Sequence, residues 1–351
     1  FVGYGRRPLG LSANGKTAVK PRFRSKIYKN TSNQIIPAYI LGGGATERIM
    51  SRATAAPPQS LTALERAIWQ TVAYFDVFDY PLTAAEVHRY LEGVTARASD
   101  IAHTLANGRF SPQHLVHANG YYMFAGREHI VAKRQRRHAL AQRLWPAAIR
   151  YGRFISSLPF VRMVAVTGSL AVNNVDEHAD IDYLVVTENG RLWLCRAFII
   201  AIVRLAARQQ LTLCPNYLLS ERVLQFSDRN LYTAHEVAQM IPLSGLATYQ
   251  QMRQANLWTA AYIPNAIGPP THVAPAPVAP HLGQRLLELP WRTPLGDWLE
   301  QWEMQRKIHK FQAHVQHNGE TDFTADWCKG HFDAHNERTM TAYQAKLSSN
   351  Q

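Results

Sequence analysis

Two aspartates separated by one residue carry the clearest chemical signal in this sequence. Asp180-Ile181-Asp182 opens an apolar run, Tyr183 to Val186, that is typical of a buried strand. Because alternate residues of a strand point to the same face, the two carboxylates project together. Paired carboxylates can hold a hard divalent cation such as Mg²⁺, which also accepts oxygens from substrate phosphates. The pair therefore predicts a metal site.

A Gly-Ser turn precedes the aspartates in the chain. Gly168-Ser169 follows another apolar run, Val164 to Val166, and is followed by a short stretch with helix potential. Glycine allows the backbone to approach a triphosphate closely. Serine and the N–H groups at a helix start offer an anion site. The turn therefore predicts phosphate binding beside the metal site.

The order of these features is strand, Gly-Ser, ten residues and Asp-x-Asp at the head of a second strand. It resembles the signature of DNA polymerase β-type nucleotidyltransferases. The resemblance implies that Gly168 and Ser169 hold phosphates, and that Asp180 and Asp182 hold Mg²⁺ or Mn²⁺. It further implies an α/β (α+β) fold with a mixed sheet flanked by helices. An ordinary surface turn with an unrelated aspartate pair is the alternative interpretation.

The family that this motif resembles places a third acidic residue on a later strand. Here the matching strand, expected at residues 211–219 after a helix over Leu192 to Gln210, contains no Asp or Glu, and Asn216 is the nearest polar residue. An amide can ligate a metal but cannot take a proton at neutral pH. Three outcomes stay open: Glu221 or Asp228 supplies the carboxylate, the acceptor needs no strong base, or the site binds nucleotide without turnover.

The pattern of residues 60–126 predicts three helices followed by a hairpin, which is the order of elements in a winged helix. Thr83 and Glu86 have the spacing of a capping box, and Asn119-Gly120 is well suited to a type I′ hairpin turn. The third helix, about Ser99 to Asn107, contains no Arg or Lys. Reading of DNA by that helix is therefore weakly supported, and packing, partner contact or dimerisation stays equally open. From about residue 61 to 347 the chain is similar to prokaryotic proteins that join a winged helix to such a nucleotidyltransferase domain.

The net charge of +13 is concentrated in two segments. Phe1 to Ile49 carries +8 and Arg127 to Arg153 carries +7, so the rest of the chain is nearly neutral. We expect residues 1–59 to be an unstructured basic extension that is not native, with a nucleic-acid-binding arm as the alternative. The pattern of residues 127–160 predicts a basic linker helix. This helix either binds the phosphates of a nucleic acid or presents a solvated face.

The remaining features predict where the protein works. Three cysteines without CxxC spacing indicate a reducing, cytoplasmic setting. The most apolar stretch, Leu192 to Ala207, is shorter than the roughly 20 residues that a bilayer needs and contains Arg196 and Arg204, so no membrane partner is expected.

Two further segments complete the predicted organisation, a nucleotidyltransferase core at 161–230 and a mainly helical region at 231–351. In the latter, His235 and Glu236 could approach the nucleotide, but such a pair on a helix is expected to be structural. Trp298 and Trp302 are expected to pack in a core.

These features together predict a metal-dependent enzyme that moves a nucleoside monophosphate from a nucleoside triphosphate, with ATP as the expected donor, to a hydroxyl group. The acceptor, whether a small molecule, an RNA or a protein, is not determined by the sequence. The alternative is a catalytically degenerate nucleotide-binding regulator that uses the winged helix to bind DNA or a protein.

Overall fold

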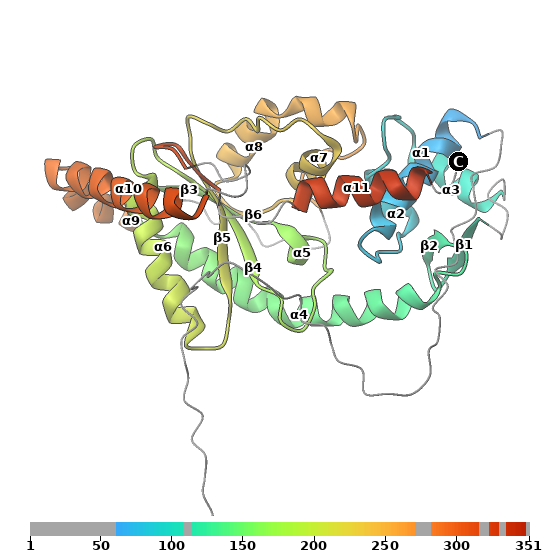
Figure 1. Cartoon of the computed structure of the whole chain (residues 1–351), viewed down its shortest axis with the longest axis horizontal. Helices are drawn as coiled ribbons and strands as arrows, with labels where there is room; N and C mark the ends of the chain where they lie inside the picture. Colours follow the sequence, from blue (N-terminus) through green and yellow to red (C-terminus); the bar gives the residue numbers. More distant parts are fainter. Residues whose placement is uncertain (1–60, 108–113, 271–281, 316–322, 330–334, 349–351) are drawn as a thin grey trace, which may run out of the picture. The chain divides into compact units, whose positions relative to one another are not determined.

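The computed structural model describes residues 61–107, 114–270, 282–315, 323–329 and 335–348. The extension predicted over residues 1–59 lies outside these ranges. The described part combines many helices with a five-stranded mixed sheet and a separate two-stranded sheet (Figure 1). The mixed α and β character predicted from the sequence is therefore confirmed.

Three helices and a hairpin open the described chain: α1 (Ala63–Asp76), α2 (Ala84–Arg89), α3 (Ala98–Ala106), β1 (Leu115–Ala118) and β2 (Tyr121–Phe124). Thr62 and Thr83 each cap a helix through a capping box, which satisfies backbone N–H groups that the first turn leaves free. Asn119 and Gly120 both have positive φ angles, 51° and 84°, as a type I′ turn requires. The capping box and the hairpin turn predicted from the sequence are thus both present.

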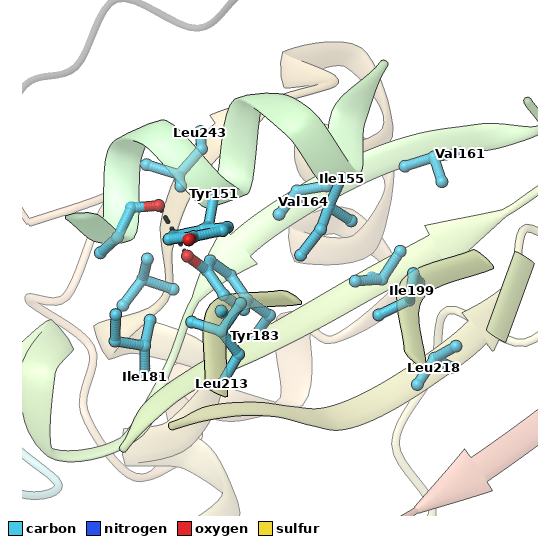
Figure 2. Close-up of a cluster of buried hydrophobic side chains, with 14 of the residues drawn as sticks. Tyr151, Ile155, Val161, Val164, Ile181, Tyr183, Ile199, Leu213, Leu218 and Leu243 are labelled. Carbon is cyan, nitrogen blue, oxygen red and sulfur yellow. Dashed lines mark hydrogen bonds between the residues drawn. The ribbon is translucent and has the colours of Figure 1, made fainter. Parts of the chain in front are cut away.

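Helix α4 (His129–Ser156) lies within the segment for which a basic helix is predicted. In its first half, Arg134 is 7% exposed, and its guanidinium forms an ion pair with the carboxylate of Glu86 at 2.7 Å. Its second half packs on the five-stranded sheet through buried residues such as Tyr151 and Ile155 (Figure 2). The helix is therefore part of the hydrophobic core as well as a carrier of positive charge.

The five-stranded sheet has the order β6-β3-β4-β5-β7. Its strands are β3 (Val161–Val166), β4 (Ile181–Thr187), β5 (Leu213–Ser220), β6 (Ile241–Ser244) and β7 (Trp327–Lys329). Strands β4 and β5 are parallel and are joined through α6 (Leu192–Ala207), and the other neighbours are antiparallel. The short helix α5 (Gly168–Ala171) lies between β3 and β4 in the chain. The two edge strands come from the region predicted to be mainly helical, and their four and three residues are too short to show a strand period.

The two faces of this sheet are covered by different helices (Figure 1). Helices α4 and α6 cover one face, where the hydroxyl of Tyr183 donates to the Ala148 carbonyl at 2.7 Å (Figure 2). Helices α7 (Leu231–Gln239) and α8 (Leu246–Ala255) cover the other face, on which Leu184 and Val186 are buried. Because side chains alternate along β4, Asp182 lies on the face of α7 and α8.

The remaining elements are η1 (Leu257–Ala261), α9 (Leu282–Glu288), η2 (Leu289–Trp291), α10 (Pro294–Val315) and α11 (His335–Ser348). Helix α10 packs on α6, and Glu300 accepts hydrogen bonds from the N–H groups of Trp193 and Leu194 in the first turn of α6. The expectation that Trp298 and Trp302 pack in a core is wrong, since they are 59% and 48% exposed and stack on one another. No helix among the described residues has the length and apolarity to cross a membrane.

Candidate functional site

Three neighbouring strands bring the polar side chains of Thr167, Asp182 and Cys214 into one row across the sheet, called the polar row below. The N–H of Thr167, directly after β3, donates to the carbonyl of Asp182 at 3.0 Å. In the parallel pair of β4 and β5, Asp182 lies opposite Cys214. Alternation along each strand places these three side chains on the same face. Asp180 immediately precedes β4, and the ligand atoms of Asp180, Asp182 and Cys214 all lie within 4.8 Å of one another.

The Gly-Ser turn rests directly on the polar row. Gly168 has a φ angle of +65°, and a Cβ atom added to it would lie 2.4 Å from Oδ2 of Asp182. Only glycine combines this backbone conformation with such a close approach. The carbonyl of Ser169 accepts a hydrogen bond from the N–H of Asn174 at 2.9 Å, which closes the turn. The structure therefore brings together Gly168 and Asp182, the two positions that the sequence motif connects.

The loop between α5 and β4 is held by side chains from other elements. Trp145 of α4 donates to Oδ1 of Asn173 at 2.8 Å, and Arg137 of the same helix pairs with Asp176 at 3.0 Å. The hydroxyl of Tyr80, from the segment between α1 and α2, donates to the Val172 carbonyl at 2.9 Å. The loop that carries the aspartate pair is therefore fixed by α4 and by the N-terminal helices.

The electrostatics of the polar row favour an added cation. Asp182 is 9% exposed, and burial, followed by the charges of Asp180 and Glu236, raises its pKa to about 8. Burial, followed by the charges of Asp182 and Asp180, likewise raises the pKa of Cys214, whose thiol donates a hydrogen bond to Asp182. Oδ1 of Asp182 has no hydrogen-bond partner within the described part of the chain. A divalent cation would offset the repulsion and occupy this free oxygen.

Glu236 of α7 adds a third carboxylate near the aspartates. Burial raises its pKa to about 7, while the positive charge of Lys329 on β7 acts in the opposite direction. Its own charge contributes to the raised pKa of Asp182, so the two carboxylates lie within electrostatic reach. The sequence interpretation treated Glu236 as structural. A carboxylate between the buried residues His235 and Val237 was the signal that could have identified it.

The positions predicted for the third acid have different surroundings. Strand β5 is irregular at Asn216: Tyr183 lies opposite Pro215 and Leu184 opposite Tyr217. Asn216 is therefore left out of the register with β4, and Cys214 stands beside Asp182 instead. Asn216 is buried, and its Oδ1 atom has no hydrogen-bond partner among the described residues, so its assignment as a possible third ligand stays a prediction.

Glu221 and Asp228 do not join the three-residue cluster either. The N–H of Glu221 donates to the Thr187 carbonyl at the far end of β4, five residues from Asp182, or roughly 16 Å at the rise of a strand. Asp228 is exposed, and Oδ2 of its carboxylate lies 3.9 Å from Nζ of Lys329. Neither Glu221 nor Asp228 therefore belongs to the cluster of Asp180, Asp182 and Cys214.

Comparisons with protein-family models, with curated proteins and with solved structures found no match for this chain. The site consists of two carboxylates, of which Asp182 is buried and Asp180 is half-buried, and the half-buried thiol of Cys214, with the Gly168 turn in contact with Asp182. Oxygen-rich clusters of this kind can bind a divalent cation, and through it the oxygens of a phosphate group.

Proposed function

We propose that this protein is a metal-dependent nucleotidyltransferase that moves a nucleoside monophosphate from a nucleoside triphosphate to a hydroxyl group. One observation carries the proposal: the carboxylates of Asp180 and Asp182 meet directly beneath the positive-φ turn at Gly168, and one buried oxygen of Asp182 has no hydrogen-bond partner among the described residues. The mixed sheet, with the aspartates at the head of β4 next to β3, agrees with the fold that the motif implies.

In this proposal Asp180 and Asp182 hold Mg²⁺ or Mn²⁺, and Gly168 and Ser169 contact the phosphates of the donor. The cation supplies neutralisation of phosphate charge when it is bound. The acceptor oxygen attacks the α-phosphorus, the bond from the α-phosphorus to its bridging oxygen breaks, and pyrophosphate leaves. The absence of a Cβ atom at residue 168 allows the Asp182 carboxylate to lie directly against the turn that is assigned to the phosphates.

The proton of the acceptor hydroxyl must be transferred to a base. Glu236 is the carboxylate of α7 that lies within electrostatic reach of Asp182, and its pKa of about 7 is close to that of an effective general base at neutral pH. We assign the proton to the carboxylate of Glu236. Lys329 of β7, whose positive charge opposes the rise in the pKa of Glu236, favours the ionised form of this carboxylate, which is the form that accepts a proton.

A catalytically degenerate nucleotide-binding regulator is the second candidate. It is favoured by strand β5, which contains no Asp or Glu where the resemblance implies a third carboxylate and which places the thiol of Cys214 opposite Asp182. In this candidate the three helices and hairpin of residues 61–126 form a winged helix that transmits the bound state. Binding of a protein is favoured over DNA, because α3 contains no Lys or Arg, and because Arg127, Lys133, Arg134 and Arg137 of the basic segment all form ion pairs within the chain.

Two measurements on the full chain test the proposal: calorimetric binding of ATP with and without Mg²⁺ or Mn²⁺, and release of pyrophosphate in the presence of candidate hydroxyl acceptors. Asp182→Asn should reduce metal-dependent nucleotide binding by more than about 100-fold, beyond the effect typical of an outer-shell change. Glu177→Gln is the matched control, since it removes the same charge from an exposed position in the same loop.

The outcomes separate the two candidates. Metal-dependent binding with pyrophosphate release supports the transferase. Metal-dependent binding without pyrophosphate release from the wild type supports the regulator, whereas release by the wild type that is lost in Glu236→Gln supports the assigned base. Metal-dependent binding that survives in Asp182→Asn would contradict both.

A further inference from the structure

The candidate ligand atoms at this site include a sulfur atom as well as carboxylate oxygens. Cys214 is the direct neighbour of Asp182 in the register of β4 and β5, and its Sγ atom belongs to the cluster whose atoms lie within 4.8 Å of one another. Mg²⁺ requires oxygen ligands in near-octahedral geometry, and a sulfur atom serves it poorly. A thiolate together with carboxylate oxygens suits Zn²⁺.

A second observation indicates that the cluster is built for a ligand. Thr167 is 2% exposed and lies on the polar row, on the other side of Asp182. Its Oγ1 atom has no hydrogen-bond partner in the described part of the chain, and neither has Oδ1 of Asp182. Buried polar atoms without partners are costly. Thr167 and Asp182 are neighbours on paired strands, so a group bound on this face of the sheet would satisfy both atoms.

We propose that Asp180, Asp182 and Cys214 form a three-ligand site for a thiophilic divalent cation, of which Zn²⁺ is the chemical type, with the remaining coordination position open toward the Gly168 turn. The inference rests on the proposed function in one respect, that Asp180 and Asp182 are metal ligands. Around a tetrahedral zinc ion such ligand atoms lie about 3.3 to 3.6 Å apart. The observed spread of at most 4.8 Å therefore needs only small side-chain movements to close on the ion.

The number of protein ligands also matters for the chemistry. Structural zinc sites use four protein ligands, whereas catalytic sites use three and leave a position for water or substrate. Two carboxylates and one thiolate carry a charge of −3, so the site keeps a net charge of −1 with the ion bound. The thiol loses its proton on binding, since a coordinating thiol is deprotonated by the metal. The open position would accept an oxygen of a phosphate group.

Cobalt substitution tests the sulfur ligand directly. The full chain is stripped with a chelator and titrated with Co²⁺, and a thiolate-to-cobalt charge-transfer band in the near ultraviolet is expected. The band should be displaced by Zn²⁺ but not by a large excess of Mg²⁺. It should vanish in Cys214→Ser and persist in Cys195→Ser, the matched control, in which the buried thiol donates to the Pro159 carbonyl at 3.2 Å and a hydroxyl can do the same.

A gain of function provides a second arm. Cys214→Asp restores an all-oxygen set, and we expect Mg²⁺ affinity to rise and Zn²⁺ affinity to fall, each by about 10- to 100-fold. If the Cys214 variants fail to fold, alkylation of the wild type followed by peptide mass spectrometry replaces them. Zn²⁺ should then protect Cys214 from labelling and Mg²⁺ should not.

Each result bears on the proposal. Bound Co²⁺ without the band, a band of full intensity in Cys214→Ser, or equal protection by Mg²⁺ and Zn²⁺ would overturn the thiolate ligand and leave Cys214 as a hydrogen-bond donor to Asp182. The proposed transferase function fails by a different measurement, the absence of nucleotide binding and pyrophosphate release. A cobalt band in a protein that does not bind nucleotide would therefore keep this metal site and reject the transferase.

Discussion

Replacement of Gly168 by alanine is a sharp test of the candidate site. The added Cβ atom would lie 2.4 Å from Oδ2 of Asp182, about 1 Å inside the usual separation of a carbon and an oxygen atom. The carboxylate or the turn must therefore move by about 1 Å. Metal sites tolerate deviations of only about 0.2 Å in ligand distance, and a displacement of 1 Å can cost on the order of 100-fold in rate.

The same substitution has a backbone cost that must be separated from this displacement. Alanine at a φ angle of +65° loses about 1 to 2 kcal/mol of stability whatever lies around it. Gly190→Ala is the matched control, because Gly190 has a φ angle of +70° and an added Cβ atom meets no described atom within 4 Å. Both variants should lose similar stability to chemical denaturant, and only Gly168→Ala should lose metal affinity.

The assay is calorimetric titration of both variants with Mn²⁺ and with Zn²⁺, together with denaturant unfolding. We expect metal affinity to fall at least about tenfold in Gly168→Ala and to stay at the wild-type value in Gly190→Ala. Wild-type metal affinity in Gly168→Ala would refute the argument, because the turn would then not constrain the carboxylate.

Four further predictions rest on the charged and polar contacts. The pKa values of Asp182 and Glu236 are raised to about 8 and about 7, so protons compete with the metal for these carboxylates. Metal affinity should therefore rise from pH 6 to pH 9, and metal binding at pH 7 should release protons. Calorimetry in buffers of different ionisation enthalpy measures this proton release. Without metal the sign for stability is opposite: a carboxyl with a raised pKa in the folded state makes the protein less stable as pH rises from about 4 to about 8, and a flat denaturation midpoint over this range would contradict the burial of Asp182. Arg137→Ala should loosen the loop between α5 and β4 and weaken metal binding several-fold. It should cost less than about 1 kcal/mol of stability, since the ion pair of Arg137 with Asp176 is partly exposed. Unchanged metal binding would show that the loop needs no support from Arg137. Tyr343→Phe removes the 2.7 Å hydrogen bond to the half-buried Glu92 and should cost about 1 to 3 kcal/mol by denaturant unfolding with metal affinity unchanged.

Local features of the fold could be predicted because they depend on short-range contacts. The capping box at Thr83 and the turn at Asn119-Gly120 each satisfy hydrogen bonds or φ angles within four residues. The strands at Val161–Val166 and Ile181–Thr187 are visible as apolar runs. Proximity of Gly168 to the aspartates followed from the order of strand, turn and strand, since antiparallel β3 and β4 bring these positions together.

Long-range features were decided by the tertiary structure. The edge strands β6 and β7 are three or four residues long and gain their structure from pairing with β3 and β5. Likewise, Glu236 reaches the site only because α7 packs against the face that carries Asp182. No periodicity in a single segment contains the information about which partner it will contact.

The residue opposite Asp182 shows most clearly what the sequence determines and what only the tertiary structure determines. The sequence determined that residues 211–219 form the next strand and that this strand contains no Asp or Glu. It did not determine the alignment of that strand, in which Cys214 lies opposite Asp182 and an irregularity just beyond this pair leaves Asn216 out of the register. A strand alternates with a period of two, so a single extra residue moves every later side chain to the other face. Which residue of β5 lies opposite Asp182 was therefore decided by the pairing of β5 with β4.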